Sequence, residues 1–170
     1  MLAATILLGI TSVAGEQSDV HKEVDFSIAK AHKLTVLNEE SLEFSFEVSS
    51  STASGTFESS TLHLKLQHNY DVGLSIGGSS FQHEDREYTI PSTWTLEWSK
   101  STSRPAAMTS LVELNASENA NAERTVVAEV NPQKVNLWMD VTVSAHRNGM
   151  VDPAGKYQAS LDVSVVDLNS

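Results

Sequence analysis

The chain has 170 residues, of which 40% are hydrophobic and 19% are charged. These proportions are typical of a globular protein rather than a disordered segment, and the length suits a single domain. The 22 Asp and Glu residues outnumber the 11 Lys and Arg residues, which gives a net charge of −11. So acidic a surface disfavours nucleic-acid and membrane-surface binding, and the lack of cysteine excludes disulfides, thiolate zinc sites and thiol nucleophiles.

Residues 1–14, MLAATILLGITSVA, predict a signal peptide. The apolar run from Leu2 to Ile10 has the length of a signal-peptide core and is too short to span a bilayer. Small residues at Ser12 and Ala14 predict cleavage before Gly15. The alternative is that this start is retained as a buried strand or helix. On the first interpretation the mature protein is exported, extracellular and without a membrane span.

Residues 15–29 form the predicted N-terminal extension, a polar segment that ends in a short alternating strand. Three apolar side chains, Val24, Phe26 and Ile28, are expected to share one face of that strand. Such a strand can pair within its own domain or complete the sheet of a neighbouring copy by β-augmentation. Val24, Phe26 and Ile28 are therefore predicted as subunit-interface residues.

Residues 30–170 form the predicted domain, in which apolar and polar residues alternate with a period of two in nearly every segment. No segment shows a convincing helical period. The expected strands cover residues 42–48, 62–66, 72–76, 94–98, 126–130, 135–143 and 157–165, with polar turns between them. The last of these has the longest clean alternation and is expected to be central. The pattern predicts an antiparallel β-sandwich, immunoglobulin-like or pilin-like, with a closed barrel as the alternative.

The titratable residues predict neither a metal site nor a cofactor. His63 and His68 are five residues apart and are expected to point to opposite faces of a strand. A zinc or copper site needs ligands that converge, so the histidines are expected to be solvated on the outer face. The loop from His83 to Glu87, and Asp152, are weak candidates for calcium without the alternating oxygens of a dedicated loop. No catalytic motif is present, and no enzymatic activity is predicted.

Trp138 is the predicted ligand or contact residue, because it falls opposite the apolar face of its own strand. Beside Asn136 and Asp140, an outward tryptophan can stack on a sugar ring. It can equally pack under a loop or against a second subunit, and large exposed aromatics usually mark protein contacts.

The sequence combines a predicted leader, an alternating strand soon after it, a predicted cysteine-free β-sandwich and the ending AGKYQASLDVSVV over residues 154–166. This layout resembles the subunits of bacterial surface fimbriae. The resemblance is nearest to the cysteine-free major pilins of the colonisation-factor type, and the chain lacks the cysteine pair of the chaperone–usher pilins. It implies a sandwich that lacks a strand, with the N-terminal strand of the next copy filling the groove.

The expected function is that of an exported, non-enzymatic subunit of an extracellular filament, a pilus or fimbria, that polymerises by donor-strand exchange and is able to take part in cell adhesion. The expected partner is the protein itself, as a homopolymer, with the chaperone and the surface receptor unidentified. The alternative is a monomeric secreted carbohydrate-binding β-sandwich, in which Trp138 serves as the platform.

Overall fold

The computed structural model describes residues 29–38, 44–129 and 135–168. The contacts divide the chain between Lys30 and Ala31, and every described strand lies in the second unit, Ala31–Ser170. The predicted leader and the predicted interface residues Val24, Phe26 and Ile28 lie outside the described residues. The described part of the chain has thirteen strands, all paired antiparallel, and no helix. The predicted all-β sandwich is confirmed.

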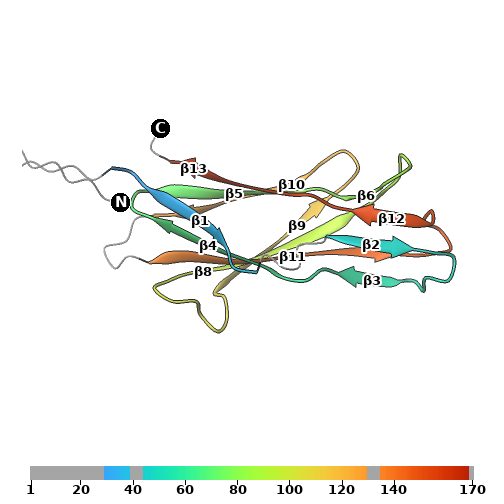
Figure 1. The fold of residues 1–170 in the computed structure, drawn as a ribbon, viewed down its shortest axis with the longest axis horizontal. Helices are drawn as coiled ribbons and strands as arrows, with labels where there is room; N and C mark the ends of the chain where they lie inside the picture. The colour runs from blue at the N-terminus through green and yellow to red at the C-terminus, as the bar shows by residue number, and fades with distance from the viewer. Residues whose placement is uncertain (1–28, 39–43, 130–134, 169–170) are drawn as a thin grey trace, which may run out of the picture. The chain divides into compact units, whose positions relative to one another are not determined.

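One layer of the sandwich is a six-stranded sheet in the order β1–β4–β11–β8–β9, with β3 paired to the far end of β11 (Figure 1). The long strand β11 pairs with β8 along one side and with β4 and then β3 along the other. Its strands are β1 (His32–Val36), β3 (Gly55–Glu58), β4 (Leu62–His68), β8 (Ser92–Ser101), β9 (Ser110–Ala116) and β11 (Asn136–Arg147).

The other layer contains two smaller sheets that continue into one another. Ser79 and Ser80 join β5 to β6, and Ala159 and Ser160 join β12 to β13, so two bent strands run through both sheets. The three-stranded sheet has the order β10–β5–β13, and the four-stranded sheet has the order β2–β12–β6–β7. These strands are β2 (Ser45–Val48), β5 (Val72–Gly78), β6 (Phe81–His83), β7 (Thr89–Ile90), β10 (Ala122–Ala128), β12 (Gly155–Gln158) and β13 (Leu161–Asp167).

The core lies between the layers and follows the alternation predicted from the sequence. In β4 the even-numbered leucines are buried while His63 and Lys65 face outward, as expected for a sheet with one solvated face. The same alternation holds over residues 92–96 of β8 and 139–145 of β11. The largest fully buried side chains are Trp94, Tyr157, Phe81, Leu64, Leu66, Leu74, Ile76, Leu96, Leu137 and Met139.

The C-terminal strand differs from its prediction. The alternation over residues 157–165 is interrupted at Ala159 and Ser160, which separate β12 from β13. The prediction of a central strand is wrong for β13, which is the last strand of its sheet, and Leu161 is only half-buried. The alternation of a strand records one buried face and contains no information about how many neighbours its backbone has.

Strand β5 ends against an aromatic ring. Trp94 is 1% exposed, and its indole N–H donates to the Ser79 carbonyl at 2.9 Å. Its ring lies so close to Gly78 that a Cβ at that position would overlap it, whereas a Cβ at Gly77 would meet only Asp162 Cβ, at 3.9 Å. Glycine at position 78 is therefore required by packing, while glycine at 77 is not.

The two neighbouring glycines provide a test of this packing. Gly78→Ala is expected to lower the free energy of unfolding by about 1–3 kcal/mol, because the methyl group must displace a fully buried tryptophan. Gly77→Ala is the control and is expected to change it by less than about 1 kcal/mol in either direction. Urea denaturation of both variants measures the difference, and equal effects would show that the Trp94 ring does not constrain β5.

Candidate functional site

Among the described strands, β13 is an end strand of its sheet, as are β1, β9 and β10 of theirs. On one side β13 pairs with β5 over all seven residues, from Leu161 opposite Gly78 to Asp167 opposite Val72. On the other side β2 pairs with β12, and the last contact among the described residues is the hydrogen bond from Ala159 N–H to the Phe44 carbonyl at 2.9 Å. Residues 39–43, which precede Phe44, lie outside the described residues. Among the described strands none continues beside Leu161–Asp167.

The direction of the backbone groups along this edge follows from two hydrogen bonds to β5 and the adjoining residues. Leu168 N–H donates to Asp71 O at 3.4 Å, and Ser79 N–H donates to Ser160 O at 3.0 Å. Backbone groups alternate from side to side along a strand, so the even-numbered residues turn theirs toward β5. The odd-numbered Leu161, Val163 and Val165 therefore turn their N–H and C=O groups toward the open edge.

The same three residues turn their side chains toward the core, where they are only half-buried. Strand β10 contacts β8 and β9, which places β13 on the opposite margin, the margin of β1. There Leu34 and Val36 of β1 are likewise half-buried against the core. Among the described residues, this margin thus combines backbone groups that no strand pairs with apolar side chains that are only half-buried. An added strand requires both.

Trp138 lies on the outer face of its strand, as predicted, but its side chain is covered. It is 8% exposed, its indole N–H donates to Ser101 O at 3.0 Å, and the Lys65 ammonium lies 5.0 Å from the ring centroid. Asn136 also bonds outward, to Thr102 O at 3.2 Å. Of the predicted alternatives, the structure favours packing beneath neighbouring groups over an open platform for a sugar.

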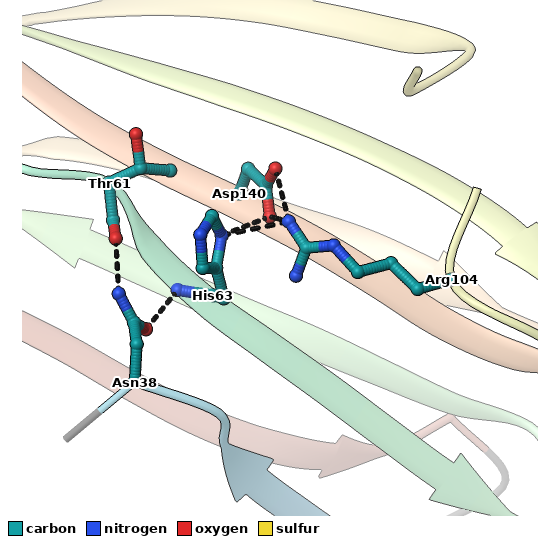
Figure 2. A network of polar contacts seen from close by, with 5 residues as sticks. All are labelled: Asn38, Thr61, His63, Arg104 and Asp140. Carbon is teal, nitrogen blue, oxygen red and sulfur yellow. Dashed lines mark hydrogen bonds and ion pairs between the residues drawn. The ribbon is translucent and has the colours of Figure 1, made fainter. Parts of the chain in front are cut away.

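A cluster of charged and polar side chains surrounds Asp140 (Figure 2). Asp140 and Trp138 are two residues apart on β11 and therefore share its outer face. The carboxylate of Asp140, on β11, accepts hydrogen bonds from Arg104 Nη2 at 2.7 Å to each oxygen. His63, on β4, places Nδ1 at 2.8 Å from Asp140 Oδ1 and 2.9 Å from Arg104 Nη2. Asn38 joins β4 to the end of β1 by accepting from His63 N–H and donating to the Thr61 carbonyl.

This cluster attaches a loop to the sheet. Arg104 belongs to the segment between β8 and β9, and its ion pair with Asp140 fixes that segment on the outer face of the sheet. His63 Nδ1 either donates to the carboxylate or accepts from the guanidinium, so each tautomer satisfies one of the two contacts. The sequence contains no signal for this cluster, because Arg104 is 41 residues from His63 and 36 from Asp140.

His83 is buried, which contradicts the expectation that the histidines are solvated. Its side chain is 6% exposed, Nε2 donates to Ala154 O at 3.0 Å, and Nδ1 accepts from Asp85 N–H at 3.0 Å. Both ring nitrogens therefore bond to backbone groups of the two neighbouring loops. The described residues hold no group of three or more His, Asp or Glu side chains placed to bind a metal ion.

Asp152, a weak calcium candidate in the sequence, is bonded within its own loop and to a tyrosine. Its carboxylate accepts from Asn148 N–H at 2.6 Å and from Tyr88 Oη at 3.0 Å. The hydrogen bond from the Tyr88 hydroxyl to Asp152 raises the pKa of Tyr88, and burial raises it further. Burial, with a smaller contribution from the negative charge of Asp152, raises the pKa of Tyr157 to about 12.

No protein-family model matches the chain, and no curated protein matches it. Within the part of the chain that the structure describes, no helix is long and apolar enough to span a bilayer.

A double-mutant cycle tests the attachment of the β8–β9 segment. Arg104→Met and Asp140→Asn are expected to show a coupling free energy of up to about 1 kcal/mol, because the side chains remain partly in contact with solvent. Raising the salt concentration to about 1 M should reduce the coupling by screening. Urea denaturation of the wild type, both single variants and the double variant measures it, and zero coupling at low salt would refute the attachment.

Alkaline unfolding tests the environment of Tyr157. The pKa of Tyr157 is raised from 10.0 in the unfolded chain to about 12 in the folded protein. Its contribution to the free energy of unfolding is therefore fully present below pH 10 and declines as the pH rises toward 12. Tyr157→Phe removes the ionisable group and is expected to flatten the loss of stability over that interval. Its overall stability is expected to fall as well, because the hydroxyl donates to Pro153 O at 2.8 Å. Identical slopes for the two proteins between pH 10 and 12 would refute this assignment.

Proposed function

We propose that this protein is an exported, non-enzymatic subunit of an extracellular filament, and that it polymerises when residues 24–28 of one copy add a strand to the open edge of β13 in the next. The observation that carries the proposal is the edge at Leu161, Val163 and Val165, which offers backbone groups and incompletely buried apolar side chains together. Backbone pairing would supply affinity, and the alternate side chains would set the register.

The donor segment and the acceptor edge correspond in length and pattern. Residues 24–28 and residues 161–165 each contain five residues with apolar side chains at alternate positions. Five residues of strand extend about 16 Å. Paired along this edge, Val24, Phe26 and Ile28 would turn their side chains to the half-buried margin between β13 and β1. The proposal assigns Phe26, the largest of the three, to the centre of that margin.

The covered position of Trp138 gives no support to the alternative of a carbohydrate-binding module. The net charge of −11 bears on assembly, because identical acidic copies repel one another in dilute salt. At an ionic strength of 0.15 M the screening length is about 8 Å, so short-range strand pairing can outweigh this repulsion. Polymerisation of the wild type is therefore expected to increase with salt.

Two substitutions at one edge residue test the proposal. Val163→Pro removes an N–H group that points to the open edge, whereas the pairing with β5 uses the even-numbered residues. It is expected to abolish polymers while leaving a folded monomer. Val163→Ala is the control: it also shortens the side chain but retains the N–H group, so it should still polymerise. Size-exclusion chromatography and negative-stain microscopy, with circular dichroism as the check on folding, give the readout.

A cross-link provides a second test that does not depend on a proline variant. In an antiparallel pairing with Phe26 opposite Val163, Asp25 stands opposite Ser164. Because the chain has no cysteine, Asp25→Cys in one preparation and Ser164→Cys in another can form a disulfide only between copies. Thr125→Cys is the control acceptor. Thr125 and Ser164 both pair with Ser75 of β5, from opposite sides, so Thr125 lies one strand further from the edge of β13. A mixed dimer is expected with Ser164→Cys and not with Thr125→Cys. A wild type that stays monomeric at every salt concentration, without this cross-link, would overturn the proposal.

A further inference from the structure

The loop between β11 and β12 presents two apolar side chains to solvent. Met150 is 92% exposed and Val151 is 70% exposed, the highest values among the described large hydrophobic residues. Exposing adjacent apolar side chains to water is unfavourable, so a pair of them at one loop tip indicates a surface that binds another molecule.

This tip is held in place by its own hydrogen bonds. Asn148 is the centre of the turn: its side-chain oxygen accepts from Met150 N–H at 3.0 Å, and its carbonyl accepts from Val151 N–H at 3.0 Å and from Asp152 N–H at 2.7 Å. Gly149 N–H donates to Thr52 O of the neighbouring turn at 3.2 Å. A loop fixed in this way loses little conformational entropy on binding.

A second apolar patch lies on the outer face of the three-stranded sheet, around Gly73. Val127 of β10 and Val166 of β13 both stand opposite Gly73 in the pairing register. Leu168 extends toward the same glycine, with Cδ2 at 3.4 Å from where a Cβ would stand. The three side chains are 44%, 42% and 41% exposed. Of the seven exposed large hydrophobic residues described, this patch and the tip account for five.

The loop between β11 and β12, which carries the tip, and the C-terminal end of β13, which carries Val166, lie at opposite ends of the sandwich (Figure 1). The turn between β4 and β5 contacts both the start of β1, through Asn69 N–H and Ala31 O at 3.1 Å, and the end of β13, through Asp71 O and Leu168 N–H at 3.4 Å. The donor segment precedes β1, so it joins the domain at the end that carries the patch. The tip is at the other end, where β11 passes into β12.

We infer that the Met150–Val151 tip of one copy packs against the Val127–Val166–Leu168 patch of the next copy. The inference rests on the proposed function: a donor strand that runs antiparallel to β13 reaches the acceptor from the acceptor's tip end. That arrangement places the patch end of the donor copy against the tip of the acceptor copy. The contact joins different surfaces of identical chains, so it repeats without closing and gives a linear assembly.

The test compares two double variants of the full chain. Met150→Ser with Val151→Ser removes the tip and is expected to raise the concentration needed for polymerisation by about tenfold or more, since two apolar side chains lose a buried contact. Leu37→Ser with Leu111→Ser is the control, because these residues are 44% and 59% exposed but belong to neither surface. It is expected to polymerise as the wild type does. Sedimentation at a series of protein concentrations gives the threshold.

A cysteine pair locates the contact directly. Val151→Cys in one preparation and Val166→Cys in another should form a mixed dimer on oxidation, whereas Leu111→Cys paired with Val166→Cys should not. If the wild type polymerises and the cysteine variants cross-link between positions 25 and 164, while the tip variant polymerises at the wild-type threshold, this inference fails and the proposed function stands. If the wild type does not polymerise and the cysteine variants give no cross-link between positions 25 and 164, both fail.

Discussion

The structure depends on a simple geometric property of β-strands: neighbouring residues turn their backbone groups to opposite sides. In β13 this property sends the backbone groups of the even-numbered residues to β5 and those of Leu161, Val163 and Val165 to the margin of the sandwich. The same odd-numbered residues direct apolar side chains to the core. Outward-facing backbone groups and half-buried apolar side chains therefore coincide at this edge, which is the acceptor in the proposed filament.

An unpaired strand edge of this kind can bind a donor strand, but it can also promote aggregation by pairing with other chains. The surface charge provides part of the protection: 22 acidic residues against 11 basic ones keep copies apart at long range. Without cysteine, the fold obtains its stability from packing, most visibly around Trp94, Tyr157 and Phe81. Long-range repulsion combined with short-range strand pairing would allow assembly in one arrangement and oppose disordered association.

The polar residues serve mainly to fix loops. Asp140 and Arg104 attach the segment between β8 and β9 to the outer face of the larger sheet, and His83 bonds to the backbone of two loops at the far end. Asn148 and Asp152 set the turn that carries Met150 and Val151. These contacts give the side chains of the tip a defined position. In the proposed filament, strand donation and the tip contact would act together on each pair of copies.

The sequence by itself determined the all-β class and most of the core, because a period of two shows which side chains are buried, as in Leu62, Leu64 and Leu66 of β4. It also placed Trp138 on the outer face. Only the tertiary structure decided that β13 is an edge, that Trp138 is covered, that His83 is buried, and that Arg104 meets Asp140. These features depend on contacts between residues distant in the chain, and local periodicity carries no information about such contacts.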